Sequence, residues 1–137
     1  MNFIKYLFRT LFALYIMLLF FFSLYSFNST PIDLSKYFWI IRIDRIAHFI
    51  MFFPFPFSAW FAFGGKIKKK TGKFAFLTLL ITGIVIASLT ETLQAFIPGR
   101  DSDWLDLVAN FTSIFLGTLL VMCIDKYAKN VWISRLQ

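Results

Sequence analysis

Two ionisable side chains stand inside long apolar stretches of this sequence, where they could carry proton chemistry. His48 is the only histidine of the chain and Glu91 is its only glutamate. An imidazole and a carboxylate are common partners in general acid and base catalysis. In a bilayer an ionisable side chain is costly unless it faces the bundle interior or water, so its presence is by itself a hypothesis of function. We therefore take His48 and Glu91 as candidate catalytic residues that handle a proton.

Several polar residues accompany this pair. Asp44 precedes His48 by four residues, so on a helix the two share a face, and the carboxylate could accept a hydrogen bond from the imidazole. Arg45 and Arg100 suit bidentate contact with a phosphate or a carboxylate. The candidate ligand-binding residues are Asp44, Arg45, Gln94, Arg100, Asp103, Asp106 and Asn110.

Four long apolar runs must position these residues. Of the 137 residues, 59% are hydrophobic and only 15% are charged, which is too apolar for a soluble domain of this size. The runs cover residues 6–27, 46–63, 74–96 and 105–124, and each has the roughly 17–25 residues that cross a hydrocarbon core as a helix. Because the connections are short, consecutive helices should be antiparallel neighbours. The sequence predicts an all-α integral membrane bundle of four transmembrane helices, forming a single domain over residues 1–137.

The basic residues set the orientation of this bundle. If both termini share a side with the 64–73 loop, that side holds ten of the 14 basic residues, and six of the seven acidic residues fall on or near the other side. The ten are Lys5, Arg9, Lys66, Lys68, Lys69, Lys70, Lys73, Lys126, Lys129 and Arg135. The positive-inside rule then places both termini in the cytoplasm. The net charge of +7 is thus accounted for by topology and lipid contact, and we expect membrane lipids and no nucleic acid as partners.

Prolines and glycines mark the second helix. Pro54 and Pro56 each remove a backbone hydrogen bond, so we expect this helix to bend, and the sequence leaves open whether the bend opens a cleft. Gly64 and Gly65 predict the end of the helix, and the lysines that follow predict a short turn over 66–73.

Polar and small residues share one face of each of the last two helices, with the polar ones toward the outer half. The third helix carries Gly83, Ala87, Glu91 and Gln94 at helical spacing, and the fourth carries Asp106, Asn110, Ser113 and Gly117. Small residues let a neighbouring backbone approach closely, so the two faces are predicted to pack against each other. At about 1.5 Å per residue, Glu91 and Asn110 lie roughly 8–9 Å below the outer helix ends, and His48 about one turn below its own. The sequence therefore predicts one outer-leaflet pocket, with Arg100 above it.

At these residues the chain resembles the VanZ-like family of small multi-pass bacterial membrane proteins, named after a protein associated with teicoplanin resistance. The family pattern has D-K-x-x-H, then E-x-x-Q-x-x-x-P-x-R, an acidic residue, and D-x-x-x-N followed by small residues. Here it reads as 44–48, then Glu91, Gln94, Pro98 and Arg100, then Asp103, Asp106 and Asn110. Arg45 replaces the family's lysine and Ser113 a common glycine. The resemblance spans 44–117, and it implies the bacterial cytoplasmic (inner) membrane and a cell-envelope role without a defined reaction.

Two hypotheses follow for the polar residues. In the first, the pocket binds, and could process, an anionic lipid or lipid-linked envelope precursor, with a link to glycopeptide resistance. In the second, the polar residues only hold the bundle or a partner interface together, with Asn110 bonded to Gln94 and Glu91 paired with Arg100 or His48.

Two further interpretations are weaker. A proton path is disfavoured because the inner helix halves offer no further ionisable residue before the cytoplasmic lysines. A metal centre is disfavoured because a lone histidine with scattered carboxylates has no ligand-spacing signature. We therefore expect no metal and no cofactor, and the sequence leaves both catalysis and the oligomeric state open.

Overall fold

The fold of the chain is known from a computed structural model, which describes residues 2–25, 37–38, 41–98 and 103–127. Helices dominate this part of the chain, which confirms the predicted all-α class. The helices are α1 (Asn2–Leu24), α2 (Ile43–Phe52), α3 (Phe55–Thr71), the short 3-10 helix η2 (Gly72–Phe74), α4 (Ala75–Gln94) and α5 (Trp104–Tyr127). Two strands of two residues, β1 (Tyr37–Phe38) and β2 (Ile41–Arg42), pair antiparallel just before α2.

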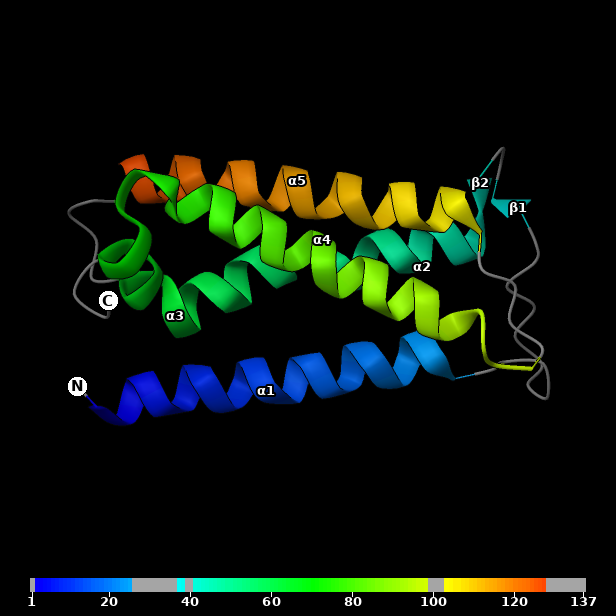
Figure 1. Ribbon diagram of the computed structural model, residues 1–137, viewed down its shortest axis with the longest axis horizontal. Coiled ribbons are helices and arrows are strands. Elements are labelled where there is room, and N and C mark those ends of the chain that lie inside the picture. The colour runs from blue at the N-terminus through cyan, green and yellow to red at the C-terminus, as the bar shows by residue number, and fades with distance from the viewer. Residues whose placement is uncertain (1, 26–36, 39–40, 99–102, 128–137) are drawn as a thin grey trace.

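The helices lie side by side in an elongated bundle (Figure 1). α2 and α3 follow each other along its length, and α4 runs back beside them. α5 packs on α2, α3 and α4, while α1 packs chiefly on α3 and α4. The beginnings of α2 and α5 and the end of α4 therefore meet at one end of the bundle, and the turn between α3 and α4 lies at the other (Figure 1).

The surface and the interior of the bundle have the polarity expected of a membrane protein. Large apolar side chains such as Phe3, Met17 and Val85 are exposed, whereas polar ones such as His48 and Asn110 are buried. By length and composition, three helical stretches of the described chain could cross a membrane: Phe3–Leu24, Ile43–Gln94 and Trp104–Tyr127. The middle stretch, of 52 residues, contains α2, α3, η2 and α4. Apolar side chains on the outside and polar side chains inside indicate that this surface faces lipid.

The predicted bend in the second helix is present, and Pro54 separates α2 from α3. The carbonyls in the last turn of a helix lack intrahelical donors. At this break the hydroxyl of Tyr15 on α1 donates a hydrogen bond of 2.6 Å to the carbonyl of Met51. A groove of about 350 Å³, lined largely by aromatic residues of α1 and α3, lies beside the break and includes Tyr15 and Pro54. The bend thus leaves an apolar groove.

The predicted end of this helix at Gly64 and Gly65 is wrong, because α3 continues to Thr71. Lys68, Lys69 and Lys70 lie in its last turn instead of in a loop. Lysine is a good helix former, and its charge is favourable near a helix C-terminus. Lys68 also pairs with Asp125 of α5, and the helix ends where Gly72 takes a φ of +55°. Glycine adopts this left-handed backbone conformation at little cost.

The predicted small-residue faces are buried, but they meet different neighbours. Gly83 of α4 does face α5, since a Cβ built there would lie 2.7 Å from Cγ2 of Ile114. Gly117 of α5 instead faces the α2–α3 break, where a Cβ would lie 3.0 Å from the carbonyl oxygen of Phe53 and 3.0 Å from Cγ of Pro56. The α5 face is therefore shared between α4 and the broken helix.

Removing the hydroxyl at the break should weaken the fold. We expect Tyr15→Phe to lower the free energy of unfolding by about 0.5–1.5 kcal/mol, because the Met51 carbonyl loses its donor. Tyr6→Phe is the matched control, since Tyr6 lies on the same helix and is 65% exposed. Thermal unfolding of the purified variants in detergent measures both changes. Equal melting temperatures for the two variants would contradict this role of Tyr15.

Filling the α4–α5 contact should also destabilise the bundle. Gly83→Val places new methyl groups against Ile114 and Phe55, and overpacking of this kind costs about 1–3 kcal/mol. Thr82→Val introduces the same side chain one residue earlier, at an exposed position. The melting temperature of Gly83→Val should fall well below that of Thr82→Val. The close approach would be refuted by a Gly83→Val protein as stable as the control.

Candidate functional site

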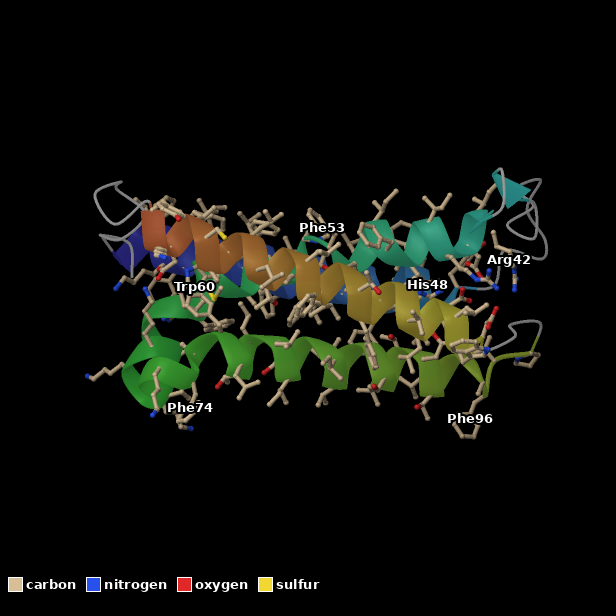
Figure 2. The ribbon with its side chains drawn as sticks, turned by 90° about the horizontal axis from the view of Figure 1, so that it is seen from above. Arg42, His48, Phe53, Trp60, Phe74 and Phe96 are labelled. Atoms are coloured by element: carbon tan, nitrogen blue, oxygen red, sulfur yellow. The ribbon has the colours of Figure 1, made fainter. Side chains whose placement is uncertain are left out.

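Four of the five acidic residues in the described part of the chain, together with two arginines and the histidine, gather where α2 and α5 begin and α4 ends. We call this region the polar end. It consists of Arg42, Asp44, Arg45, His48, Glu91, Asp103 and Asp106. Figure 2 shows Arg42 and His48 at this end of the bundle. Four elements, β2, α2, α4 and the start of α5, supply its side chains.

Asp103 is the most connected residue of the polar end. It precedes α5, and its Oδ1 accepts a hydrogen bond of 3.0 Å from the N–H of Leu105, as a helix-capping aspartate does. Its Oδ2 accepts hydrogen bonds from Arg42 at 3.2 Å and from Arg45 at 2.9 Å. Its own N–H donates to Oε1 of Glu91 at 3.0 Å. One residue thus links β2, α2 and α4 to the start of α5.

These contacts stabilise the ionised carboxylate of Asp103. The hydrogen bond from the Leu105 N–H and the hydrogen bond from Arg45 hold the pKa of Asp103 below its ordinary value. The positive charges of Arg45 and Arg42 act in the same direction. Asp103 therefore stays ionised across the physiological pH range.

A second group of side chains lies next to these contacts. Asp44, His48 and Asp106 each offer one ligand atom, and these atoms all lie within 4.8 Å of one another. Nε2 of His48 lies 3.9 Å from Oδ1 of Asp44, as the four-residue spacing on α2 predicts. His48 and Asp106 are only 2% and 1% exposed. The triad is therefore nearly shielded from solvent, and Asp106 reaches it from α5.

Arg45 connects the two groups. Its Nε lies 3.7 Å from Oδ1 of Asp106, while its terminal nitrogen Nη2 donates a hydrogen bond to Oδ2 of Asp103. The side chain of Arg45 is 22% exposed, so the guanidinium lies between the buried triad and the outside.

The two amide side chains of the predicted pocket have separate environments. Nε2 of Gln94 donates a hydrogen bond of 2.8 Å to the carbonyl of Ser23 on α1. Asn110 is fully buried one turn beyond Asp106, and neither its Nδ2 nor its Oδ1 has a hydrogen-bond partner among the described residues. The Gln94–Asn110 hydrogen bond that the structural hypothesis predicts is therefore absent, because Gln94 is turned toward α1.

Most of the predicted site residues lie at or beside the polar end. Asp44, Arg45, His48, Glu91, Asp103 and Asp106 belong to it, with Asn110 one turn deeper on α5. Gln94 lies at the end of α4 against α1, and Arg100 is outside the described residues. Arg42 was missed by the sequence analysis. Its closeness in sequence to Arg45 was the available signal, although Arg42 lies in β2, just ahead of α2.

The comparison with protein families decides the relationship that the motif suggested. The model of the VanZ/LLP1 family matches residues 8–125, which is most of the chain. The chain belongs to the VanZ/LLP1 family. No curated protein and no solved structure gave a significant match.

The VanZ/LLP1 match extends beyond the motif region at 44–117 to include most of α1 and nearly all of α5. The resemblance found from a few spaced polar residues is thereby confirmed. In this VanZ/LLP1 protein the motif residues of α2 and α5 are those that the fold brings together around Asp103 and His48.

The acid stability of this VanZ/LLP1 protein should depend on Asp103. Because the folded-state pKa of Asp103 is lowered, its ionised form stabilises the fold fully above the unfolded pKa of about 3.9. That contribution is lost as the pH falls through the still lower pKa of the folded state. Asp103→Asn keeps a helix cap but loses the charge, and we expect it to cost about 1–2 kcal/mol at neutral pH.

The measurement is the melting temperature of wild type and Asp103→Asn in detergent from about pH 7 to about pH 2. Wild type should be the more stable at neutral pH, and the gap should close in the acid part of the range. Asp125→Asn, at the other end of the bundle, controls for loss of a carboxylate. A gap that stays constant over the whole range would rule out the charged state of Asp103 as its cause.

Proposed function

We propose that this VanZ/LLP1 protein is a multi-pass protein of the bacterial cytoplasmic membrane, with four membrane-crossing segments and both termini in the cytoplasm. The segments are α1, α2 with α3, α4, and α5. The distribution of charge supports this arrangement. Lysines of the α3–α4 turn lie at the end of the bundle where α1 begins and α5 ends, opposite the polar end (Figure 1). The positive-inside rule puts that lysine-rich end in the cytoplasm.

We further propose that the polar end binds the phosphate-bearing headgroup of an anionic lipid or lipid-linked envelope precursor in the outer leaflet. One observation carries this proposal. Arg42 and Arg45 direct their guanidinium groups at the same carboxylate oxygen, Oδ2 of Asp103. Guanidinium binds phosphate and carboxylate oxygens with the same geometry, so a headgroup phosphate could take up these donors.

The exposure of the two arginines fits a ligand that arrives from outside the bundle. Their side chains are 27% and 22% exposed, and that of Asp103 is 19% exposed. A headgroup could therefore reach them without entering the buried triad. In this proposal, resistance to a glycopeptide antibiotic follows if binding changes the precursor that the antibiotic recognises.

Catalysis is a further step of the same proposal. His48 and Glu91 would handle a proton if the bound molecule is processed, and both lie next to the residues that would hold it. Binding without reaction requires only the arginines.

The alternative function is structural, and the contacts of Asp103 favour it specifically. Asp103 links four elements of the bundle through its hydrogen bonds, as expected of a network that only stabilises the fold. In the structural alternative, loss of these residues lowers protein level and stability, and any envelope phenotype falls only in proportion.

A comparison of two variants separates the alternatives. Arg42→Ala combined with Arg45→Ala, and Asp103→Asn alone, both break the same ion pairs, but only the double variant removes the phosphate donors. Native mass spectrometry of the proteins purified from membranes measures the co-purified phosphate-bearing lipid. We expect at least a tenfold loss in the double variant and full retention in Asp103→Asn. Lys66→Ala, an exposed lysine at the other end, is the control for lost charge.

The same strains provide a cellular test. Expression of wild type in a susceptible bacterium should lower its sensitivity to teicoplanin, and the double arginine variant should not. If both variants lose the same stability and carry the same lipids as wild type, the headgroup proposal fails and the structural alternative holds.

A further inference from the structure

The triad Asp44, His48 and Asp106 has the composition of a metal-binding group. It offers two carboxylates and one imidazole within 4.8 Å of one another, from two different helices. Asp44 and His48 are joined by helical spacing, but Asp106 joins them only through the packing of α5 on α2. For a tetrahedral ion with ligand bonds of about 2.0–2.2 Å, neighbouring ligand atoms are about 3.4 Å apart. The 3.9 Å between Nε2 of His48 and Oδ1 of Asp44 needs to close by about 0.5 Å, and a separation at the 4.8 Å limit of the triad by about 1.4 Å.

Unsatisfied polar atoms at the same place point to a bound group. Oδ1 of Asp106 has no hydrogen-bond partner in the described chain, although the residue is 1% exposed. Its ion pair with Nε of Arg45, at 3.7 Å, is longer than a hydrogen bond. Asn110, one turn further along the same face of α5, is fully buried and also lacks partners for both polar atoms. Buried polar atoms in native proteins are nearly always paired, with protein, water or a ligand.

The charge of the polar end favours a cation as that group. Arg42 and Arg45 both pair with Asp103, and Nε of Arg45 also lies 3.7 Å from Oδ1 of Asp106. The triad itself brings the two carboxylates of Asp44 and Asp106 together beside one imidazole in a mostly buried place. A buried excess of negative charge is costly at low dielectric. One divalent cation would balance it.

We infer that Asp44, His48 and Asp106 bind a divalent metal ion at the polar end, with Asn110 as the adjoining polar group. An imidazole favours Zn²⁺ and related transition metals, while carboxylates also suit Mn²⁺, so the site is suited to Zn²⁺ or Mn²⁺ more than to Ca²⁺. The inference goes beyond the headgroup proposal, because none of the three ligands binds the lipid there, and with a metal ion bound His48 is a ligand while proton handling falls to Glu91. A bound ion would add positive charge beside Arg45, and it could polarise a phosphate or activate a water molecule.

The experiment measures metal content of the full chain in detergent. Protein stripped with EDTA is incubated with Zn²⁺ or Mn²⁺, desalted and analysed by inductively coupled plasma mass spectrometry. We expect about one ion per chain in wild type and at least a tenfold weaker affinity in Asp44→Asn and in His48→Gln. Asp125→Asn removes a carboxylate at the opposite end and should bind as wild type does. Retention of wild-type affinity in both triad variants would overturn the assignment.

A second measurement needs no variant and so does not depend on their folding. Co²⁺ bound by nitrogen and oxygen ligands gives visible absorption, and its titration into stripped wild type should saturate near one equivalent and be displaced by Zn²⁺. The same geometry without metal would hold a protonated His48 between the two carboxylates. In that case wild type takes up neither Co²⁺ nor Zn²⁺, and the inference is wrong. Lipid content is measured separately, so either proposal can fail while the other stands.

Discussion

The carboxylate of Asp103 is the contact on which the polar end of this protein depends. It caps α5 through Leu105, and it gathers Arg42 and Arg45 from the segment that starts α2. Its backbone N–H also donates a hydrogen bond to Glu91, the only glutamate of the chain. Because Asp106 lies three residues further on, fixing the start of α5 also fixes the side chain that reaches His48. The buried triad thus owes its geometry to an interaction outside it.

The other constraint is the break between α2 and α3, which shapes the middle of the bundle. Pro54 and Pro56 cannot donate backbone hydrogen bonds, and the break they cause brings the Phe53 carbonyl against Gly117. Tyr15 satisfies a second carbonyl there. In lipid no water can satisfy such groups, so they must be covered by neighbouring helices. Gly117 on α5 therefore leaves room for the break that the prolines cause, and Tyr15 on α1 covers one of its carbonyls.

Sequence was sufficient for most features that depend on one helix at a time, although the end of α3 at Thr71 was missed. Apolar length predicted the helices, prolines predicted the bend, and spacing predicted which faces of α4 and α5 are buried. Spacing does not tell which neighbour a buried face meets. For that reason Gln94 turned out to contact α1 and Gly117 the break. Asp44, His48 and Asp106 were all predicted in one pocket, but only the packing of α5 on α2 shows that Asp106 lies directly beside the pair on α2. Arg100 is still a sequence prediction, since it lies outside the described residues.

The polar end divides into two layers that differ in how well their atoms are paired. Around Asp103, both carboxylate oxygens and the backbone N–H are hydrogen-bonded, as in a network that stabilises a fold. One turn deeper Oδ1 of Asp106, and two turns deeper the amide of Asn110, lack hydrogen-bond partners in the described chain. A network that served only to hold helices together would gain from pairing those atoms too, since each unpaired buried group costs about 1–3 kcal/mol. The layer around Asp103 therefore suits both the structural alternative and the proposed headgroup site, and the deeper layer, with its unpaired atoms, is where we infer a metal ion.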